Sequence, residues 1–113
     1  MNCKEIPALS RENIILYIAS GDPDKVTEAL LSLFLNKVDK DLAIMYCKLA
    51  MQSPDFNIRR LGICGMGHIA RVYGVSDTGV FDEYIAKFKK CKNPKIQASL
   101  RDALDDFKIF IKA

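Results

Sequence analysis

One histidine, one arginine and three aspartates are the residues of this chain whose types and spacing could do chemistry. His68 and Arg71 are three residues apart, so on a helix they project from the same flank. Asp102, Asp105 and Asp106 follow near the end of the chain. A carboxylate that orients a histidine is a familiar acid–base device in enzymes. Asp102 and Asp106 are also like charges one helical turn apart, which need a cation nearby.

The surroundings of His68 favour a structural role over a catalytic one. The chain has one histidine, no serine or cysteine in a nucleophile-elbow context and no glycine-rich phosphate loop. We therefore expect the carboxylates of Asp102 and Asp106 to pair with Arg71 between two helices, with the histidine as the alternative donor. Asp105 is expected to pair with the arginine four residues before it. No catalytic residue is predicted, and the chain is not expected to be an enzyme.

The cysteines are spread through the chain without a metal-binding interval. They are Cys3, Cys47, Cys64 and Cys91, with no CxxC motif and no histidine at a ligand spacing. Three of them lie in helical patterns, where a reduced thiol behaves as a small hydrophobe. We expect free thiols, no metal, no cofactor and a reducing cytoplasmic environment.

Composition predicts one globular domain over residues 1–113. At 113 residues the chain is long enough for one core and too short for two, and with half of its residues apolar and 27% charged its composition is that of a globular protein. The net charge of +3 is too small to identify a nucleic-acid binder. Neither a secretion signal nor a membrane-spanning stretch is recognised.

Three sequences of a short polar residue followed by proline predict the starts of three similar helices. Such a residue caps free backbone amides, and proline is tolerated at the first helical position. The three sequences are Asp22-Pro23-Asp24, Ser53-Pro54-Asp55 and Asn93-Pro94-Lys95. Further helical segments are expected over about residues 10–19, 37–52 and 78–91. The starts are roughly 30 to 40 residues apart, which favours an all-α solenoid of about six helices in antiparallel pairs. A plain six-helix bundle is the alternative.

Glycines crowd the middle of the predicted helix from Pro54 to Tyr73. Each glycine inside a helix costs about 0.5–1 kcal/mol relative to alanine. On a helical projection Gly62 and Gly65 share the apolar stripe, so we expect them to let a neighbouring helix approach closely. Gly67 lies opposite and is expected to pack against the other layer, with a bound ligand as the alternative. Gly74 is expected to cap the helix.

Two motifs in the second half of the chain resemble those of a family of small bacterial HEAT-like proteins. A Gly-His-hydrophobic-Ala-Arg run lies within residues 61–74, and an Ala-Leu-Asp-Asp run within residues 102–107. The resemblance extends from Ser53 onward and implies a HEAT-like helical domain. It also implies that the motif residues hold the scaffold together. They are His68, Arg71, Asp102, Asp105 and Asp106.

Members of this family resemble immunity proteins of contact-dependent growth inhibition and other polymorphic toxin systems. The resemblance implies a small cytoplasmic protein, a monomer or a 1:1 heterodimer with its toxin. Its partner would be the C-terminal domain of a cognate toxin, and it would neutralise that domain by occluding the active site. Nucleases that cut RNA, including domains similar to the EndoU class, are among such toxins.

A nuclease toxin is generally basic, so an acidic docking face is expected on its inhibitor. Lysines are concentrated in residues 87–95, which leaves carboxylates near the starts of the predicted second to fourth helices. The candidate toxin-binding residues are Asp22, Asp24, Glu28, Asp39, Asp41 and Asp55. Each is also explained by the preference for acidic side chains in the first turn of a helix.

Two other functions compete with toxin immunity. A HEAT-like scaffold or regulator that binds an ordinary cellular protein would share every feature above. Direct nucleic-acid binding would need exposed aromatic rings among the lysines of residues 87–92. We expect Phe81, Tyr84 and Phe88 to face the core instead, so neither nucleic-acid nor membrane binding is predicted.

Overall fold

The computed structural model describes residues 9–75 and 78–110, and all regular structure in these residues is helical. The predicted all-α class is confirmed. The elements are α1 (Arg11–Ala19), α2 (Pro23–Leu35), α3 (Lys40–Met51), α4 (Phe56–Val72), the short 3-10 helix η1 (Gly79–Phe81), α5 (Asp82–Lys89) and α6 (Pro94–Phe110). No helix of this part of the chain is long and apolar enough to cross a membrane.

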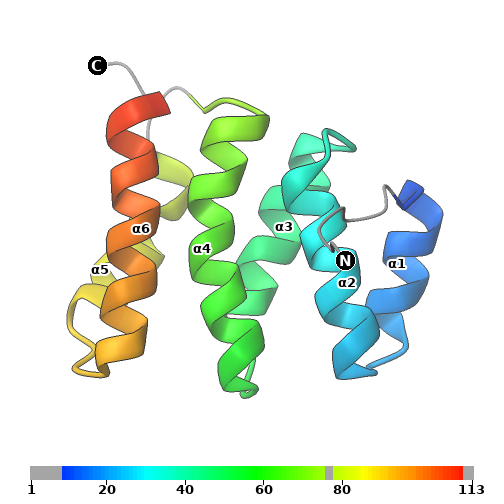
Figure 1. Ribbon diagram of the computed structural model, residues 1–113, viewed down its shortest axis with the longest axis horizontal. Helices are drawn as coiled ribbons and strands as arrows, with labels where there is room; N and C mark the ends of the chain where they lie inside the picture. Colours follow the sequence, from blue (N-terminus) through cyan, green and yellow to red (C-terminus); the bar gives the residue numbers. More distant parts are fainter. Residues whose placement is uncertain (1–8, 76–77, 111–113) are drawn as a thin grey trace, which may run out of the picture.

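Successive helices run in opposite directions and pack as antiparallel pairs. Helix α1 packs on α2, α3 on α4 and α5 on α6. Helices α2, α4 and α6 stand side by side with α4 in the middle, and α3 and α5 lie behind them (Figure 1). The body measures 33 × 29 × 28 Å, so this short stack has no long axis. The paired arrangement matches the sequence expectation, whereas the solenoid stays a prediction.

Two of the three predicted helix starts are confirmed in detail. The side chain of Asp22 accepts from the amide of Asp24, and Pro23 is the first residue of α2. The side chain of Asn93 accepts from the amides of the second and third residues of α6, which begins at Pro94. In both cases a proline occupies a position whose amide has no helical partner.

The third predicted start is wrong by two residues. Helix α4 begins at Phe56 and not at Pro54, and its cap is Asp55. The carboxylate of Asp55 accepts from two amides of the first turn, while the hydroxyl of Ser53 accepts from the amide of Asp55. A charged acceptor makes the stronger bond to a helix N-terminus, so the aspartate caps the helix and the serine shapes the turn before it.

The glycines of α4 bring it close to three different helices. A side-chain carbon added at Gly62 would lie 2.8 Å from the backbone of Met51 in α3, and one at Gly65 would lie 2.6 Å from the ring of Phe34 in α2. At Gly67 the added carbon would lie 3.1 Å from the backbone of α6. Close packing of all three glycines is therefore confirmed. The expectation that Gly67 meets the other layer is wrong, because α6 lies in the same layer as α4.

The end of α4 is fixed by a glycine cap and a tyrosine. Gly74 has a φ of +78° and donates its amide to the carbonyl of Ile69, as predicted for a helix terminus. The hydroxyl of Tyr73 reaches the connection between α2 and α3. It lies 2.6 Å from the carbonyl oxygen of Leu33 and accepts from the amide of Val38 at 2.9 Å.

The predicted reduced thiols are confirmed for the cysteines that the structure describes. Cys47, Cys64 and Cys91 are free, and Cys3 lies outside the described residues. Cys47 is fully buried between α3 and α4, where burial raises the pKa of its thiol and the sulfur donates to the carbonyl of Gly62. The thiol thus behaves as a small core side chain.

Candidate functional site

Four of the five recognisable motif residues lie along one polar seam between α4 and α6, whereas Asp105 is exposed and lies outside it. Arg60 donates from Nε to the hydroxyl of Ser99 at 3.1 Å, and the carboxylate of Asp106 lies against the backbone of Gly67. Residues that lie one helical turn further along α4 and α6 extend this contact between the two helices. We define the polar seam as Arg60, Cys64, His68 and Arg71 of α4 with Ser99, Asp102 and Asp106 of α6.

The ion pair expected in this seam does not form. The guanidinium of Arg71 turns back along α4, and its Nη2 lies 2.8 Å from Nδ1 of His68. Within the described ranges the one ion pair closer than 4 Å joins Arg11 and Asp39. The predicted pairing of Asp105 with its neighbouring arginine is therefore also wrong. Arg101 and Asp105 are exposed, and an exposed ion pair gains little over solvation by water.

His68 is held in its neutral form. Burial lowers the pKa of His68, the charge of Arg71 lowers it further, and the carboxylate of Asp106 opposes both. Because Arg71 donates to Nδ1, the ring accepts there and carries its proton on Nε2. One turn away, burial raises the pKa of the Cys64 thiol, which keeps the sulfur protonated. The seam thus contains a hydrogen-bonded imidazole and a protonated thiol, and no activated nucleophile.

The neutral histidine predicts a loss of stability in mild acid. The pKa of His68 lies below its ordinary value of 6.5 in the folded chain, so the unfolded chain takes up a proton first as the pH falls. The stability that neutral His68 contributes to the folded chain is complete above the ordinary value of 6.5. It is lost as the pH falls through the pKa that His68 has in the folded chain. Urea unfolding between pH 7.5 and pH 5 should show a smaller loss for His68→Gln than for the natural chain. Parallel pH profiles for the two proteins would contradict this assignment.

The structure does not bring the six predicted toxin-binding carboxylates onto one face. Because neighbouring helices are antiparallel, α2 and α4 begin at the lower end of the molecule in Figure 1 and α3 begins at the upper end. Asp22, Asp24 and Asp55 therefore lie at the opposite end from Asp39 and Asp41. The sixth carboxylate, Glu28, is half-buried within α2.

Half of these carboxylates already serve as helix caps. Asp22, Asp39 and Asp55 each accept from backbone amides of the helix that follows. The pKa of Asp39 is lowered by the amide of Leu42 and by the side chain of Arg11. Asp24 and Asp41 lie in the first turns of α2 and α3, as the helix-dipole explanation expects, and the proposed single acidic face is wrong in its arrangement.

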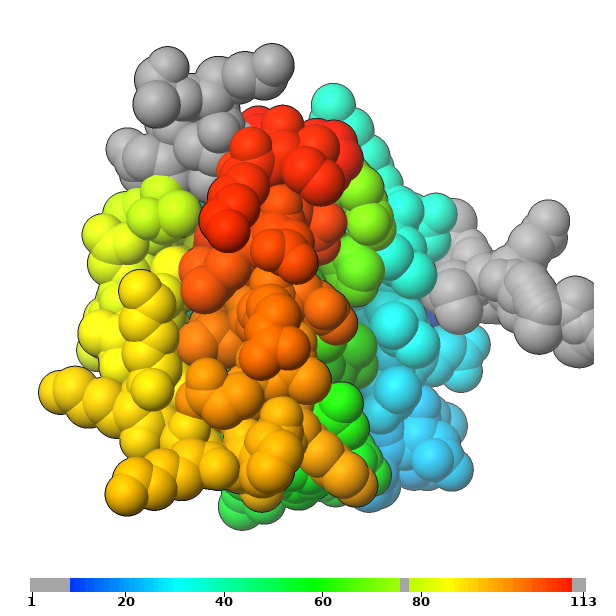
Figure 2. Space-filling view, turned by 60° about the vertical axis from the view of Figure 1, so that its left-hand side comes forward, coloured from blue at the N-terminus to red at the C-terminus, as the bar shows by residue number. Residues whose placement is uncertain are grey.

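Cations gather around the end of α5 and the start of α6, at the lower end of the molecule, where Asp22, Asp24 and Asp55 also lie. Helices α4 and α6 begin there and α5 ends there, and Figure 2 shows the end of α5 and the start of α6, in gold and orange, projecting at the lower edge. We define the basic end as Arg59, Lys87, Lys89, Lys90, Lys92 and Lys95. The lysine run is visible in the sequence, but the fold adds the arginine from the distant start of α4.

The aromatic residues beside these lysines face inward, as predicted. Phe81 and Phe88 are buried, and Tyr84 is half-buried with its hydroxyl accepting from Gln52 of α3 at 2.8 Å. The rings are therefore not available as stacking platforms for bases.

A hollow of about 400 Å³ lies next to the basic end, between the α3–α4 turn and the end of α5. Buried Met51 and Phe88 form its base, and Arg59 and Lys87 stand at its edge. We call it the cation-edged hollow. It is lined by Met51, Gln52, Ser53, Pro54, Arg59, Lys87, Phe88 and Cys91.

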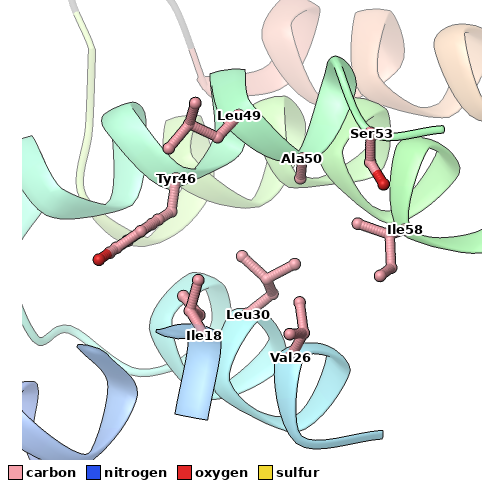
Figure 3. A pocket seen from close by; sticks show the side chains of 8 residues that line it. All are labelled: Ile18, Val26, Leu30, Tyr46, Leu49, Ala50, Ser53 and Ile58. Carbon is pink, nitrogen blue, oxygen red and sulfur yellow. The ribbon is translucent and has the colours of Figure 1, made fainter. Parts of the chain in front are cut away.

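A second, apolar groove lies on the other side of the same turn. It encloses about 220 Å³ between the α1–α2 pair and α3. In Figure 3, Ile18, Val26 and Leu30 face Tyr46, Leu49 and Ala50 across it, with Ser53 and Ile58 at one end. Leu49 is 52% exposed at its edge. Of the apolar run of residues 14–18 only Ile18 lines this groove, so the sequence alone does not point to it.

Comparisons of the chain with protein-family models, curated proteins and solved structures found no match. The resemblance of the motifs in α4 and α6 to a family of HEAT-like proteins is therefore an expectation from the sequence.

Proposed function

We propose that the chain is an immunity protein that binds a cognate toxin domain and blocks access to its active site. The observation that carries the proposal is that the family-like motifs meet in the polar seam between α4 and α6. At this contact Gly67 of the first motif lies close to Ala103 and Asp106 of the second, which agrees with the structural role that the resemblance implies. The partner would then be contacted by the remaining faces of the molecule.

The surface of the chain supports binding of a protein. An interface of ordinary size takes about 800 Å² from each partner. The chain exposes 6516 Å², so about an eighth of its surface would be used and several helices must contribute. The cation-edged hollow and the apolar groove flank one turn, and together they span helices α1 to α5. Because the helices are already ordered before a partner binds, the entropic cost of binding is reduced.

The same proposal places the protein in the cytoplasm, as a monomer that forms a 1:1 complex. The free cysteines support a reducing compartment. The alternative is a HEAT-like scaffold or regulator, which would bind a cellular protein without neutralising a toxin.

The proposal is tested by asking whether the chain neutralises a toxin domain that is encoded beside its gene. Cells that express the toxin domain should grow when the chain is co-expressed, and the two purified proteins should elute as a 1:1 complex. The matched control is an unrelated toxin domain, against which the chain should give no protection. A complex without protection would favour the scaffold, and the absence of both binding and protection would refute immunity.

A further inference from the structure

The basic end and the cation-edged hollow form one continuous surface because they share Arg59 and Lys87. The walls of the hollow are fixed by hydrogen bonds between elements. Arg59 donates from Nη1 to the carbonyl of Ser53 at 2.9 Å, which holds its guanidinium beside the α3–α4 turn. The side chain of Gln97 in α6 donates to the carbonyls of Phe88 and Cys91 and so fixes the end of α5. The surface is therefore built before any partner binds.

The charges of this surface are not neutralised within the described part of the chain. None of the six cations of the basic end lies within 4 Å of a described carboxylate, since the one such ion pair is at the opposite end. The nearest acidic cap, Asp55, directs its carboxylate to the amides of α4. A cluster of unpaired cations attracts an acidic surface and speeds its association.

The apolar base of the hollow identifies the partner as a protein. A nucleic acid would meet the lysines through its phosphates and would leave the pocket over Met51 and Phe88 unfilled, and no exposed ring is present here for stacking. A lipid surface would need protruding apolar side chains. The exposed large apolar residues of the described chain lie elsewhere: Leu16, Met45, Leu49, Val80, Ile109 and Phe110.

We infer that the basic end and the cation-edged hollow are the docking surface, and that the partner presents an acidic patch around one apolar side chain that enters the hollow. This inference rests on the proposed function for the identity of the partner, the toxin domain. The substrate groove of a nuclease toxin binds phosphates and is therefore itself basic. The basic docking surface of the chain thus contacts an acidic region of the toxin domain beside that groove. With the docking surface bound beside the groove, the remainder of the chain covers the active site of the toxin domain.

Charge reversal at two exposed lysines tests the inference. The double variant Lys87→Glu/Lys90→Glu should bind the adjacent toxin domain at least tenfold more weakly, mainly through slower association, with the difference shrinking as salt is raised. The matched control is Lys37→Glu/Lys40→Glu, an equal charge change at exposed residues of the opposite end, which should alter affinity less than twofold. Circular dichroism and thermal unfolding of both variants should match the natural chain.

A lysine-acetylation footprint of the natural complex gives an answer that does not depend on any variant. Lys87, Lys90 and Lys92 should become protected when the toxin domain binds, while Lys37 and Lys40 stay reactive. Binding with the basic end unprotected, or unchanged affinity of the basic-end variant, would overturn the inference and leave the proposed function standing. Absence of any complex would overturn both. Salt-dependent binding of a 20-nucleotide RNA or of phosphatidylglycerol vesicles at these lysines, without a toxin footprint, would also overturn it.

Discussion

Replacing Gly65 by alanine is expected to lower the free energy of unfolding by about 1–3 kcal/mol. The new side-chain carbon would lie 2.6 Å from Cε2 and 2.8 Å from Cζ of Phe34. Phe34 is fully buried, so its ring has no solvent-filled space into which it can move. The strain therefore exceeds the gain of about 0.5–1 kcal/mol that alanine brings to a helix interior. Urea unfolding followed by circular dichroism measures the difference.

The sign of this effect should reverse when the ring is removed. Leucine at position 34 lacks the two ring atoms nearest to the added carbon, so Gly65→Ala in a Phe34→Leu background should stabilise the protein. The double-mutant cycle compares Gly65→Ala with and without the ring. If Gly65→Ala costs the same free energy in both backgrounds, contact with Phe34 is not the reason for the glycine.

Replacing Tyr73 by phenylalanine is expected to cost about 1–3 kcal/mol, because partly buried backbone groups lose their partner. The Tyr73 hydroxyl lies 2.6 Å and 2.8 Å from the carbonyls of Leu33 and Asn36, and it accepts from the amide of Val38 at 2.9 Å. The variant keeps the ring and its packing, so the loss reports the hydroxyl alone. Hydrogen exchange at the amide of Val38 should become faster along with the loss of stability.

Tyr46→Phe is the matched control for this substitution. The hydroxyl of Tyr46 has no hydrogen-bond partner among the described residues, although its ring lines the apolar groove. Its removal should change the free energy of unfolding by less than about 0.5 kcal/mol. Equal losses for Tyr46→Phe and Tyr73→Phe would show that the link from α4 to the α2–α3 connection is not what stabilises the fold.

The helices were predictable because their signals are local. The caps at Asp22 and Asn93 and the glycine at position 74 act within one turn of the backbone, and the structure keeps all three. The error at Ser53 arose where two local acceptors compete, and only the geometry of the turn shows that Asp55 caps α4. Local rules thus predicted the helices, and they failed at one helix boundary, where two such rules conflict.

The candidate site was harder to predict because it depends on how distant elements are oriented. The carboxylates near three helix starts look like one face in the sequence, but antiparallel packing sends Asp39 to the end opposite Asp22 and Asp55. Arg59 joins the lysines of α5 only because α4 and α5 both pack on α6. Side-chain direction was equally hidden, since Arg71 reaches His68 on its own helix rather than a carboxylate on α6.

The position of α4 makes the folding of this molecule cooperative. In a long helical array each repeat contacts only its neighbours, and an end repeat can unfold while the others persist. Here α4 is shared, because it packs on α2, α3 and α6 through closely fitted glycines. Displacing α4 would break its own pair and remove the main neighbour of the other two pairs at once. We therefore expect the three pairs to behave as one thermodynamic unit, which gains and loses its structure in a single all-or-none transition.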